Sequence, residues 1–224
     1  MDDALHIESL TGAAILPYLD TLARLRITVF REFPYLYDGS PAYEADYLAT
    51  YGACPESLFV LARRGETIIG MSTGIPLAAE TTAVKAPFEA FGLAPEQIFY
   101  FGESVLLAPF RGQGIGARFF DAREAHARRL GRFSHTAFCA VERPADHALR
   151  PAGYRSLDGF WQHRGYRRQP ELRAAMRWQD IDQPAETEKS MVFWLRALGG
   201  RDHDQHESPS GGGDAGQAAR TTES

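Results

Sequence analysis

Apolar residues recur along this chain with two different spacings, which predict the helices and the strands. Helices place an apolar residue at every third or fourth position, whereas strands alternate or form short unbroken apolar runs. The first helical pattern covers residues 13–30, with apolar positions at Leu16, Leu19, Leu22, Ala23, Ile27 and Phe30. Further helices are predicted over residues 43–51, 114–130 and 157–164, with a shorter one near the centre of residues 78–95.

The strand patterns fall between these helices in an order that indicates the fold class. They cover residues 5–10, 57–62, 67–75, 98–107, 135–141, 173–181 and 191–197. The charged turn at residues 63–66 joins two of them as a hairpin. Only residues 98–141 read as a strand–helix–strand crossover. The order therefore predicts an α+β fold with a mixed, mostly antiparallel sheet, and not a doubly wound α/β fold.

Composition divides the chain into one domain and a tail. Residues 199–224 contain almost no large apolar side chain, and we expect them to be a disordered C-terminal tail. Residues 1–198 are enough for a single domain with a sizeable core. The formal net charge of −5 indicates neither a nucleic-acid nor a membrane partner. The sequence has no apolar run of about 20 residues and no signal-peptide pattern, so a cytoplasmic protein is expected.

The cysteines and histidines suggest no metal or disulfide chemistry. Cys54 and Cys139 are too few for a disulfide framework, and Cys139 falls in an apolar strand pattern, where a buried free thiol is expected. No Cys-x-x-Cys or histidine spacing typical of a metal site occurs. His126 follows Arg123 and precedes two further arginines in the long helical pattern, which we interpret as a solvated face.

The segment from Arg111 to Ala117 carries the clearest chemistry. Gly112, Gly114 and Gly116 alternate with other residues between a strand pattern and a helix pattern. Glycines let a backbone approach a ligand closely. The start of a helix presents unpaired N–H groups and the positive end of a dipole. Together these features predict a binding site for an anion, most often a phosphate.

Several kinds of site share such a glycine loop. Gly112, Gly114 and Ala117 satisfy the loose pattern of a dinucleotide-binding oxidoreductase, with Glu142 near the end of the next strand. That fold needs further strand–helix units, for which the remaining chain is too short. A P-loop needs Lys-Ser or Lys-Thr after its last glycine, and Ala117-Arg118 stands there instead. A further alternative is that the glycine-rich segment is only a turn between a strand and a helix and binds no ligand.

Two segments resemble the GNAT superfamily of N-acetyltransferases. Arg111, Gly114 and Gly116 match its signature Arg/Gln-x-x-Gly-x-Gly/Ala, within a segment that begins at Gly102. Residues 160–166 resemble the family's aromatic-aromatic-x-x-x-Gly-aromatic helix ending. The order of elements over residues 5–198 is also similar. The resemblance implies a sheet that splays apart between the fourth and fifth strands, flanked by helices.

The resemblance also implies acetyl-CoA as cosubstrate and a set of residues that bind it. In this family the loop backbone holds the coenzyme A pyrophosphate, which corresponds here to Gly112, Gln113, Gly114, Ile115, Gly116 and Ala117, with Arg111 at the head of the loop. The pantetheine arm pairs with the backbone of the preceding strand, which corresponds to Leu106 and Leu107. Residues 138–140 are expected to line the opposite wall.

The implied reaction moves an acetyl group directly to an amine. An amine is protonated near neutral pH, so a base must first remove a proton, and Glu103 is the candidate. The alternative is that Glu103 has no catalytic role and faces solvent or pairs with an arginine. Many family members use a tyrosine as acid, but Trp161 stands at that position and cannot serve as one. Tyr154 and Tyr166 are nearby in sequence, although a packing role is expected for both.

In the family that this chain resembles, the first two helices and their loop cover the acceptor, so the resemblance implies an acceptor site beneath them here. This region is rich in aromatic residues, namely Phe30, Phe33, Tyr35, Tyr37, Tyr43 and Tyr47, accompanied by Asp38, Glu44 and Asp46. Aromatic faces with carboxylates suit a small amine. The simpler interpretation is that the aromatic residues pack in the core and the acidic residues lie on the surface. The function predicted is an acetyl-CoA-dependent N-acetyltransferase for a small primary amine. The alternative is a coenzyme A-binding sensor without turnover, and the sequence leaves a homodimer open.

Overall fold

The computed structural model describes residues 4–199, and the rest of the predicted tail lies outside them. The described strands are β1 Leu5–Thr11, β2 Leu58–Arg64, β3 Thr67–Pro76, β4 Ile98–Tyr100, β5 Ser104–Leu106, β6 His135–Val141, β7 Arg167–Gln179 and β8 Glu186–Ala197. The helices are α1 Leu19–Phe30, α2 Pro41–Ala53, α3 Thr82–Ala90, α4 Ile115–Leu130 and α5 Asp158–His163. Short 3-10 helices are η1 Gly12–Tyr18, η2 Leu77–Ala79, η3 Pro95–Gln97 and η4 Ala108–Phe110.

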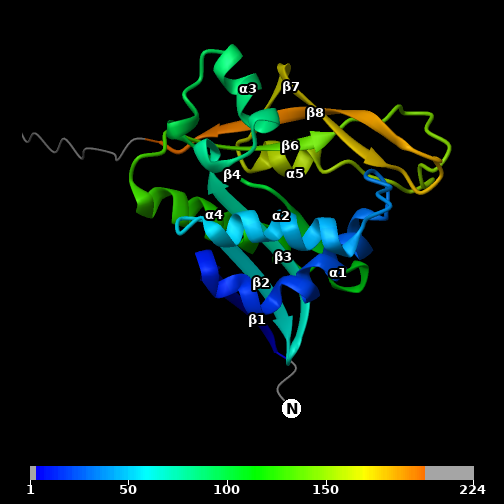
Figure 1. Cartoon of the computed structure of the whole chain (residues 1–224), viewed down its shortest axis with the longest axis horizontal. Coiled ribbons are helices and arrows are strands. Elements are labelled where there is room, and N and C mark those ends of the chain that lie inside the picture. Colours follow the sequence, from blue (N-terminus) through cyan, green and yellow to red (C-terminus); the bar gives the residue numbers. More distant parts are fainter. Residues whose placement is uncertain (1–3, 200–224) are drawn as a thin grey trace, which may run out of the picture.

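The strands form one sheet in the order β1-β2-β3-β4-β6-β8-β7 (Figure 1). Neighbouring strands are antiparallel, except that β4 and β6 are parallel. The last bond between these two segments runs from Phe101 N to Ala137 O at 2.8 Å. Beyond it β5 pairs with β3 instead of β6, so the sheet opens. The predicted α+β fold with a splayed, mostly antiparallel sheet is confirmed. A doubly wound dinucleotide-binding fold is wrong for the described residues.

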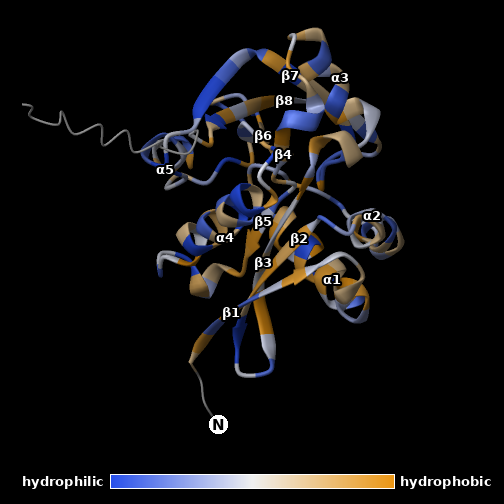
Figure 2. Ribbon diagram, turned by 90° about the vertical axis from the view of Figure 1, so that its left-hand side faces the viewer, coloured by the Kyte–Doolittle hydropathy of each residue, from blue (hydrophilic) through white to orange (hydrophobic). Residues whose placement is uncertain are grey.

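Helices cover both faces of the sheet. Figure 2 shows α1 and α2 on one face of β1–β3, and α4 on the other. The alternating side chains of β2 build both cores: Phe59 and Leu61 pack towards α1 and α2, while Leu58 and Val60 pack towards α4. This two-sided burial explains why β2 and β3 read as continuous apolar runs in the sequence.

Four predicted elements differ from the structure for local reasons. The helix predicted over residues 13–30 begins as η1 and becomes α-helical only at Leu19; Pro17 lies inside η1 and has no N–H to donate to a preceding carbonyl. The strand predicted over residues 98–107 is broken at residues 101–103, between β4 and β5. The strands β7 and β8 begin earlier than predicted, since their first residues are mostly exposed and lack an apolar pattern.

The interpretation of the polar face of α4 as solvated is wrong for Arg123 and His126, whereas Arg128 and Arg129 are exposed. Arg123, Glu124 and His126 are all buried. Arg196 pairs with Glu124 at 2.7 Å, and His126 Nε2 lies 2.9 Å from Glu56 O. Each polar group on this face therefore has a partner, so that burial does not leave it unsatisfied. Within the described residues no helix is both long and apolar enough to cross a bilayer.

Candidate active site

The glycine loop has a backbone that only glycine adopts readily. Gly112 and Gly114 have left-handed φ values of 76° and 78°, and Gly114 is the N-cap of α4. A Cβ added at either position would meet no atom within 4 Å. These glycines are therefore required by backbone conformation and leave open space in front of the loop. In the first turn of α4 the Ala117 N–H donates to Gly114 O at 3.1 Å, whereas the N–H groups before it precede the regular helical bonds and face outward at the helix start.

Arg111 holds the loop in place through polar bonds. Its guanidinium forms two hydrogen bonds with Glu32, of 2.6 and 3.0 Å, and its Nε donates to Leu106 O at 3.1 Å. The loop is thereby fastened both to the end of α1 and to β5. Leu107 is different: its N–H donates to Ile69 O, and its carbonyl accepts the Phe110 N–H. Both backbone groups of Leu107 are thus engaged.

A cavity of about 880 Å³ runs from this loop into the opening of the sheet; we call it the loop cavity. Its walls include the loop glycines Gly112, Gly114 and Gly116 with Ala117, the strand residues Ser104 and Leu106, and residues 138–140 on the β6 side. Leu107, Gln113 and the side chain of Ile115, which is buried in the core, do not line it. The loop cavity therefore joins an anion-binding helix start to the gap between two strands.

Glu103 lies at the break between β4 and β5, where the sheet opens. Its backbone is fixed on both sides: its N–H donates to Thr73 Oγ1 at 3.2 Å, and its carbonyl accepts the Thr73 N–H at 3.0 Å. The Arg123 guanidinium donates to the carbonyls of Glu103 and Thr73 at 3.1 and 3.3 Å. Burial lowers the pKa of Arg123 to about 10, which still leaves it charged at neutral pH.

The Glu103 carboxylate belongs to a buried group of charges centred on Arg26. Arg26 Nη1 lies 2.5 Å from Glu103 Oε2, while Arg26 Nε bonds Glu44. Burial opposes the positive charge, but Glu103, Tyr47 and Glu44 together raise the pKa of Arg26 above its ordinary value. One oxygen of each carboxylate, Oε1 of Glu44 and of Glu103, has no hydrogen-bond partner. These two buried acceptors are free to bind a donor.

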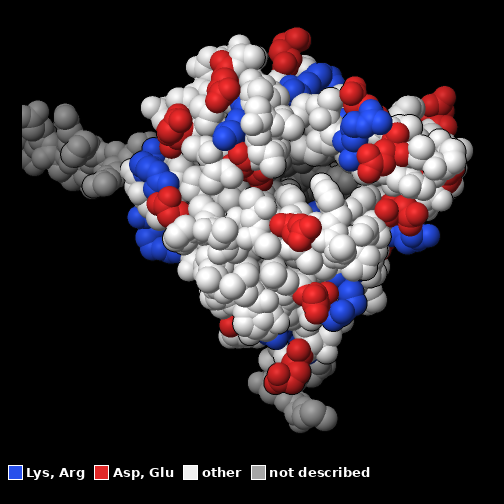
Figure 3. All heavy atoms as spheres, in the orientation of Figure 1, with Lys and Arg blue, Asp and Glu red and all other residues white. Residues whose placement is uncertain are grey.

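A second cavity, of about 590 Å³, lies on the other side of Glu103; we call it the aromatic cavity. Figure 3 shows the surface hollowed between α2 and the region of α3 and β7. Its walls include the aromatic residues Phe30, Tyr35, Tyr37, Tyr43, Tyr47, Tyr100 and Trp178, and the acidic residues Asp38, Glu44, Glu80, Glu103 and Glu186. Glu103, Gly102 and Cys139 line both cavities. The two cavities therefore meet at the opening of the sheet.

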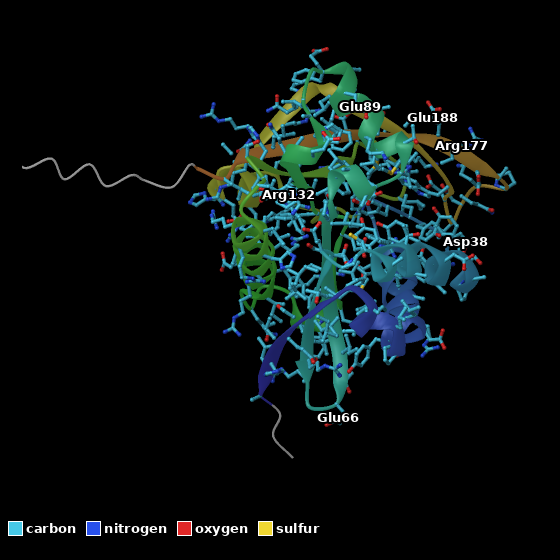
Figure 4. All side chains as sticks on the ribbon, turned by 60° about the vertical axis from the view of Figure 1, so that its left-hand side comes forward. Asp38, Glu66, Glu89, Arg132, Arg177 and Glu188 are labelled. Carbon is cyan, nitrogen blue, oxygen red and sulfur yellow. The ribbon has the colours of Figure 1, made fainter. Side chains whose placement is uncertain are left out.

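The loop between α1 and α2 is fastened over the sheet by Arg143. This side chain donates to the carbonyls of Pro34 and Tyr35, each at 2.7 Å, and pairs with Asp180 at 2.7 Å. Trp178 Nε1 also donates to Tyr35 O at 3.0 Å. These bonds keep the aromatic residues of the loop at the wall of the aromatic cavity. Figure 4 shows Asp38 and Arg177 on the side of the molecule where this loop faces β7.

The residues predicted for the acceptor region divide between the two cavities. Phe33 lines the loop cavity, and Asp46 lines neither. Trp161 and Tyr154 line the loop cavity, whereas Tyr166 is a core residue whose hydroxyl lies 2.9 Å from Thr136 Oγ1. His126, His135 and His163 line neither cavity. Cys139 is a free, half-buried thiol, and its Sγ lies 3.1 Å from the Tyr100 hydroxyl.

Sequence reasoning missed several residues of this site. Arg26 lies on the buried face of α1, and Arg123 lies on the buried face of α4. Thr73 belongs to β3, and Glu80 follows η2. A charged residue within an apolar stripe, as Arg26 is between Ala23 and Ile27, was the available signal. Over residues 4–199 no group of three His, Cys, Asp or Glu residues could hold a metal ion.

Comparisons with known proteins agree on one family. The sequence model of the acetyltransferase (GNAT) family matches residues 22–166. The ribosomal-protein-alanine N-acetyltransferase of Brucella melitensis superposes with a TM-score of 0.54 at 14% identity, over 86% of this chain and 99% of that chain. An N-acetyltransferase of Staphylococcus aureus Mu50 gives 0.55 at 11% identity, over 88% and 99%.

A Salmonella typhimurium protein, solved with its cofactor acetyl-CoA, gives a TM-score of 0.52 at 9% identity, over 92% of this chain and 98% of that chain. No curated protein sequence matches the chain. At these identities the structural likeness establishes the fold, while the family match spans more than half of the sequence.

Proposed function

Because the chain belongs to the GNAT family of acetyl-CoA-dependent acetyltransferases, we propose that it acetylates the primary amine of a small molecule. One observation carries the proposal: Glu103, a buried carboxylate, lies where the loop cavity meets the aromatic cavity. A coenzyme held in the first cavity and an amine held in the second would meet at this carboxylate.

The loop cavity suits the coenzyme in shape and in polarity. The N–H groups of residues 112–116 and the dipole of α4 would hold its pyrophosphate, with Ala117 at the cavity wall and its own N–H bonded to Gly114 O. Arg111 would support the loop through its bonds to Glu32, with the phosphates bound mainly by backbone. The pantetheine arm would run along Leu106, which lines the cavity and whose carbonyl also accepts Arg111 Nε, rather than along Leu107, both of whose backbone groups are engaged. Gln113 and Ile115 would contribute only their backbone.

Acetyl-CoA would supply the activated acetyl group, and residues of this chain would prepare the amine. The ammonium form of an amine, with a pKa near 10 in water, has no lone pair for attack. Glu103 would accept its proton. As the new C–N bond forms at the acetyl carbon and the C–S bond breaks, the second proton of the nitrogen passes to the departing thiolate, which gives the amide and the free thiol. Trp161 lines the cavity but cannot donate a proton as an acid, so the thiolate would leave without a protein acid.

The aromatic cavity suits a small cationic acceptor. Its volume lies within the usual range for small-molecule pockets, about 300–1,000 Å³. Tyrosine and tryptophan faces attract a cation, and the free oxygens of Glu44 and Glu103 can accept its N–H bonds. An anionic acceptor would meet unfavourable charge at these carboxylates. The cavity therefore favours amines that carry an apolar or aromatic body and no carboxylate.

The test is thiol release with a pool of primary amines. The protein is mixed with acetyl-CoA and each amine, and free thiol is followed together with the acetylated product. We expect turnover with one or more cationic amines and none with their N-acetylated forms. Tight coenzyme binding without thiol release from any amine would contradict this function and favour a coenzyme A-binding sensor of the same fold.

A further inference from the structure

A continuous chain of buried and partly buried hydrogen bonds connects Glu103 with a second carboxylate, Glu80. The Tyr47 hydroxyl lies 3.2 Å from Glu103 Oε2 and 3.1 Å from the Tyr51 hydroxyl. The Tyr51 hydroxyl in turn bonds Glu80 Oε1. Glu80 Oε2 accepts the Thr81 N–H at 3.0 Å. Four side chains from three parts of the fold thus form one hydrogen-bonded line between two carboxylates.

Helix spacing and a missing side chain make this line geometrically feasible. Tyr47 and Tyr51 are four residues apart on α2, so they share one face of the helix. Their rings are 5.3 Å apart. Gly102, directly before Glu103, carries no Cβ; one placed there would collide with the Tyr51 hydroxyl and approach Thr73 Oγ1 to 2.7 Å. Glycine at position 102 therefore leaves the space in which the Tyr51 hydroxyl lies.

The two ends of the line differ in their electrostatic surroundings. Glu103 is paired with Arg26, whereas Glu80 has no ion pair among the described residues. Burial raises the pKa of Glu80, with opposing contributions from its bonds to Tyr51 and Thr81. The other titratable or charged groups that act on Glu80 or feel its charge are Glu103, Lys85, Tyr47, Tyr100 and Cys139. A proton that reached Glu80 would neutralise the buried negative charge of this carboxylate, which has no ion-pair partner among the described residues.

We propose that Glu80 is the final acceptor of the amine proton, delivered from Glu103 through the hydroxyls of Tyr47 and Tyr51. The inference rests on the proposed function and deepens it. The ammonium gives one proton to Glu103. The carboxyl proton then passes to Tyr47 as the Tyr47 proton passes to Tyr51 and the Tyr51 proton passes to Glu80. One proton leaves the amine and one arrives at Glu80, while Glu103 and both phenols regain their starting states.

The relay gives Arg26 and Glu80 separate tasks. Arg26 stabilises Glu103 in the charged form that receives the proton, and transfer onward restores that ion pair. Glu80 also lines the aromatic cavity, from which its proton can reach solvent after turnover. A relay of this kind would keep the reacting amine apart from bulk water while still removing its proton.

Two variants interrupt the relay at different links. Glu80→Gln removes the final acceptor, and Tyr51→Phe removes one link without changing the charge of the cavity. Matched controls are Glu89→Gln, an exposed carboxylate on α3, and Tyr18→Phe, a phenol outside both cavities. Figure 4 shows Glu89 at the outer side of α3. Melting temperature and acetyl-CoA affinity establish that each variant is folded and binds coenzyme.

The decisive measurement compares acceptors of different basicity. The best amine of the pool is tested beside its β,β,β-trifluorinated analogue, which is a much weaker base and is largely unprotonated at neutral pH. For the strong base we expect both relay variants to lose about 100-fold in kcat/KM, the lower end of what a positioned proton acceptor contributes. The fluorinated amine should lose less than about 5-fold, because little of it needs deprotonation before attack.

The pH profile gives a second readout. In the wild type, kcat/KM should fall as pH decreases through the raised pKa of Glu80, because a protonated Glu80 cannot accept the proton. This acidic limb should be absent from Glu80→Gln and present in Glu89→Gln. Equal losses with both amines would assign Glu80 and Tyr51 a merely structural role.

The outcomes separate the relay from the proposed function. Normal turnover by the wild type, with unchanged rates and pH profiles in both relay variants, would overturn the relay alone. Failure of the wild type to release thiol with any amine, while it still binds acetyl-CoA, would overturn the proposed function and the relay with it. A selective loss with the strong base in both variants would support both.

Discussion

Replacing Arg26 with methionine removes the buried cation at the centre of the site. Arg26 contacts Glu44 and Glu103, and the exposed fractions of these three side chains are 10%, 0% and 2%. Its guanidinium also lies 4.3 Å from the ring centre of Tyr47 and 5.0 Å from that of Phe30. Methionine keeps an unbranched apolar stem of similar reach, so the change isolates the charge and its bonds.

The expected cost follows from the charges left behind. Removing one partner of a buried ion pair typically destabilises a protein by about 3–5 kcal/mol, because the other charge stays buried without compensation. The lost cation–π contacts add about 1 kcal/mol. Removal of the guanidinium's own desolvation cost offsets part of this sum. We expect the free energy of unfolding to fall by about 4 kcal/mol at pH 8. Protonation of the unpaired carboxylates should shrink this loss at pH 5.

Urea unfolding at pH 5 and pH 8 measures both quantities, with equal m-values as the check that the unfolded states are comparable. Arg31→Met is the matched control: its ion pair with Asp38 is 2.9 Å long, but the side chains are 57% and 48% exposed. Exposed pairs contribute about 0–1 kcal/mol. A loss in Arg26→Met no larger than in the control, and independent of pH, would refute the reasoning.

Three further changes test other parts of the molecule. Gly114→Val should weaken acetyl-CoA binding at least tenfold, about 1.4 kcal/mol by calorimetry, whereas Gly131→Val has the same left-handed strain at the far end of α4 and should leave affinity unchanged. Glu103→Gln should lower kcat about 100-fold or more for a strongly basic amine, and an unchanged rate would reject its role as base. Arg143 holds the pKa of Asp180 below its usual range against the effect of burial. The stability from this pair is therefore fully present above the ordinary aspartate pKa and is lost as pH falls through the lowered pKa of the folded state, so the cost of Asp180→Asn, about 3 kcal/mol at pH 7, should shrink progressively below about pH 4, measured by chemical unfolding.

The sequence predicts the glycine loop and the fold because both depend on local patterns. Gly112 and Gly114 mark left-handed positions that few other residues adopt, and the crossover from β4 to β6 follows from one strand and one helix pattern. The break at residues 101–103 was not predictable in the same way. It depends on Thr73 and Arg123, which bond Glu103 from segments 30 residues before it and 20 residues after it in the chain.

Buried charges limit what periodicity can reveal. Arginine is most often a surface residue, so Arg123, followed by Arg128 and Arg129 on the same helix, reads as solvated from the sequence. In the structure its guanidinium lies 4.2 Å from the Phe101 ring centre and bonds two carbonyls at the sheet break. A hydropathy pattern records the type of each residue, whereas burial of a charge depends on partners that the fold supplies.

The two halves of the site differ in how they recognise their ligands, and this decides what one sequence can reveal. The coenzyme half consists largely of backbone N–H groups, whose requirement is a few small residues within a short segment. A short motif therefore identifies the ligand. The acceptor half includes side chains from α1, α2, α3, β4 and β7, and the distances between them are set by the whole fold. Its specificity is consequently best tested with amines that differ in charge and body size.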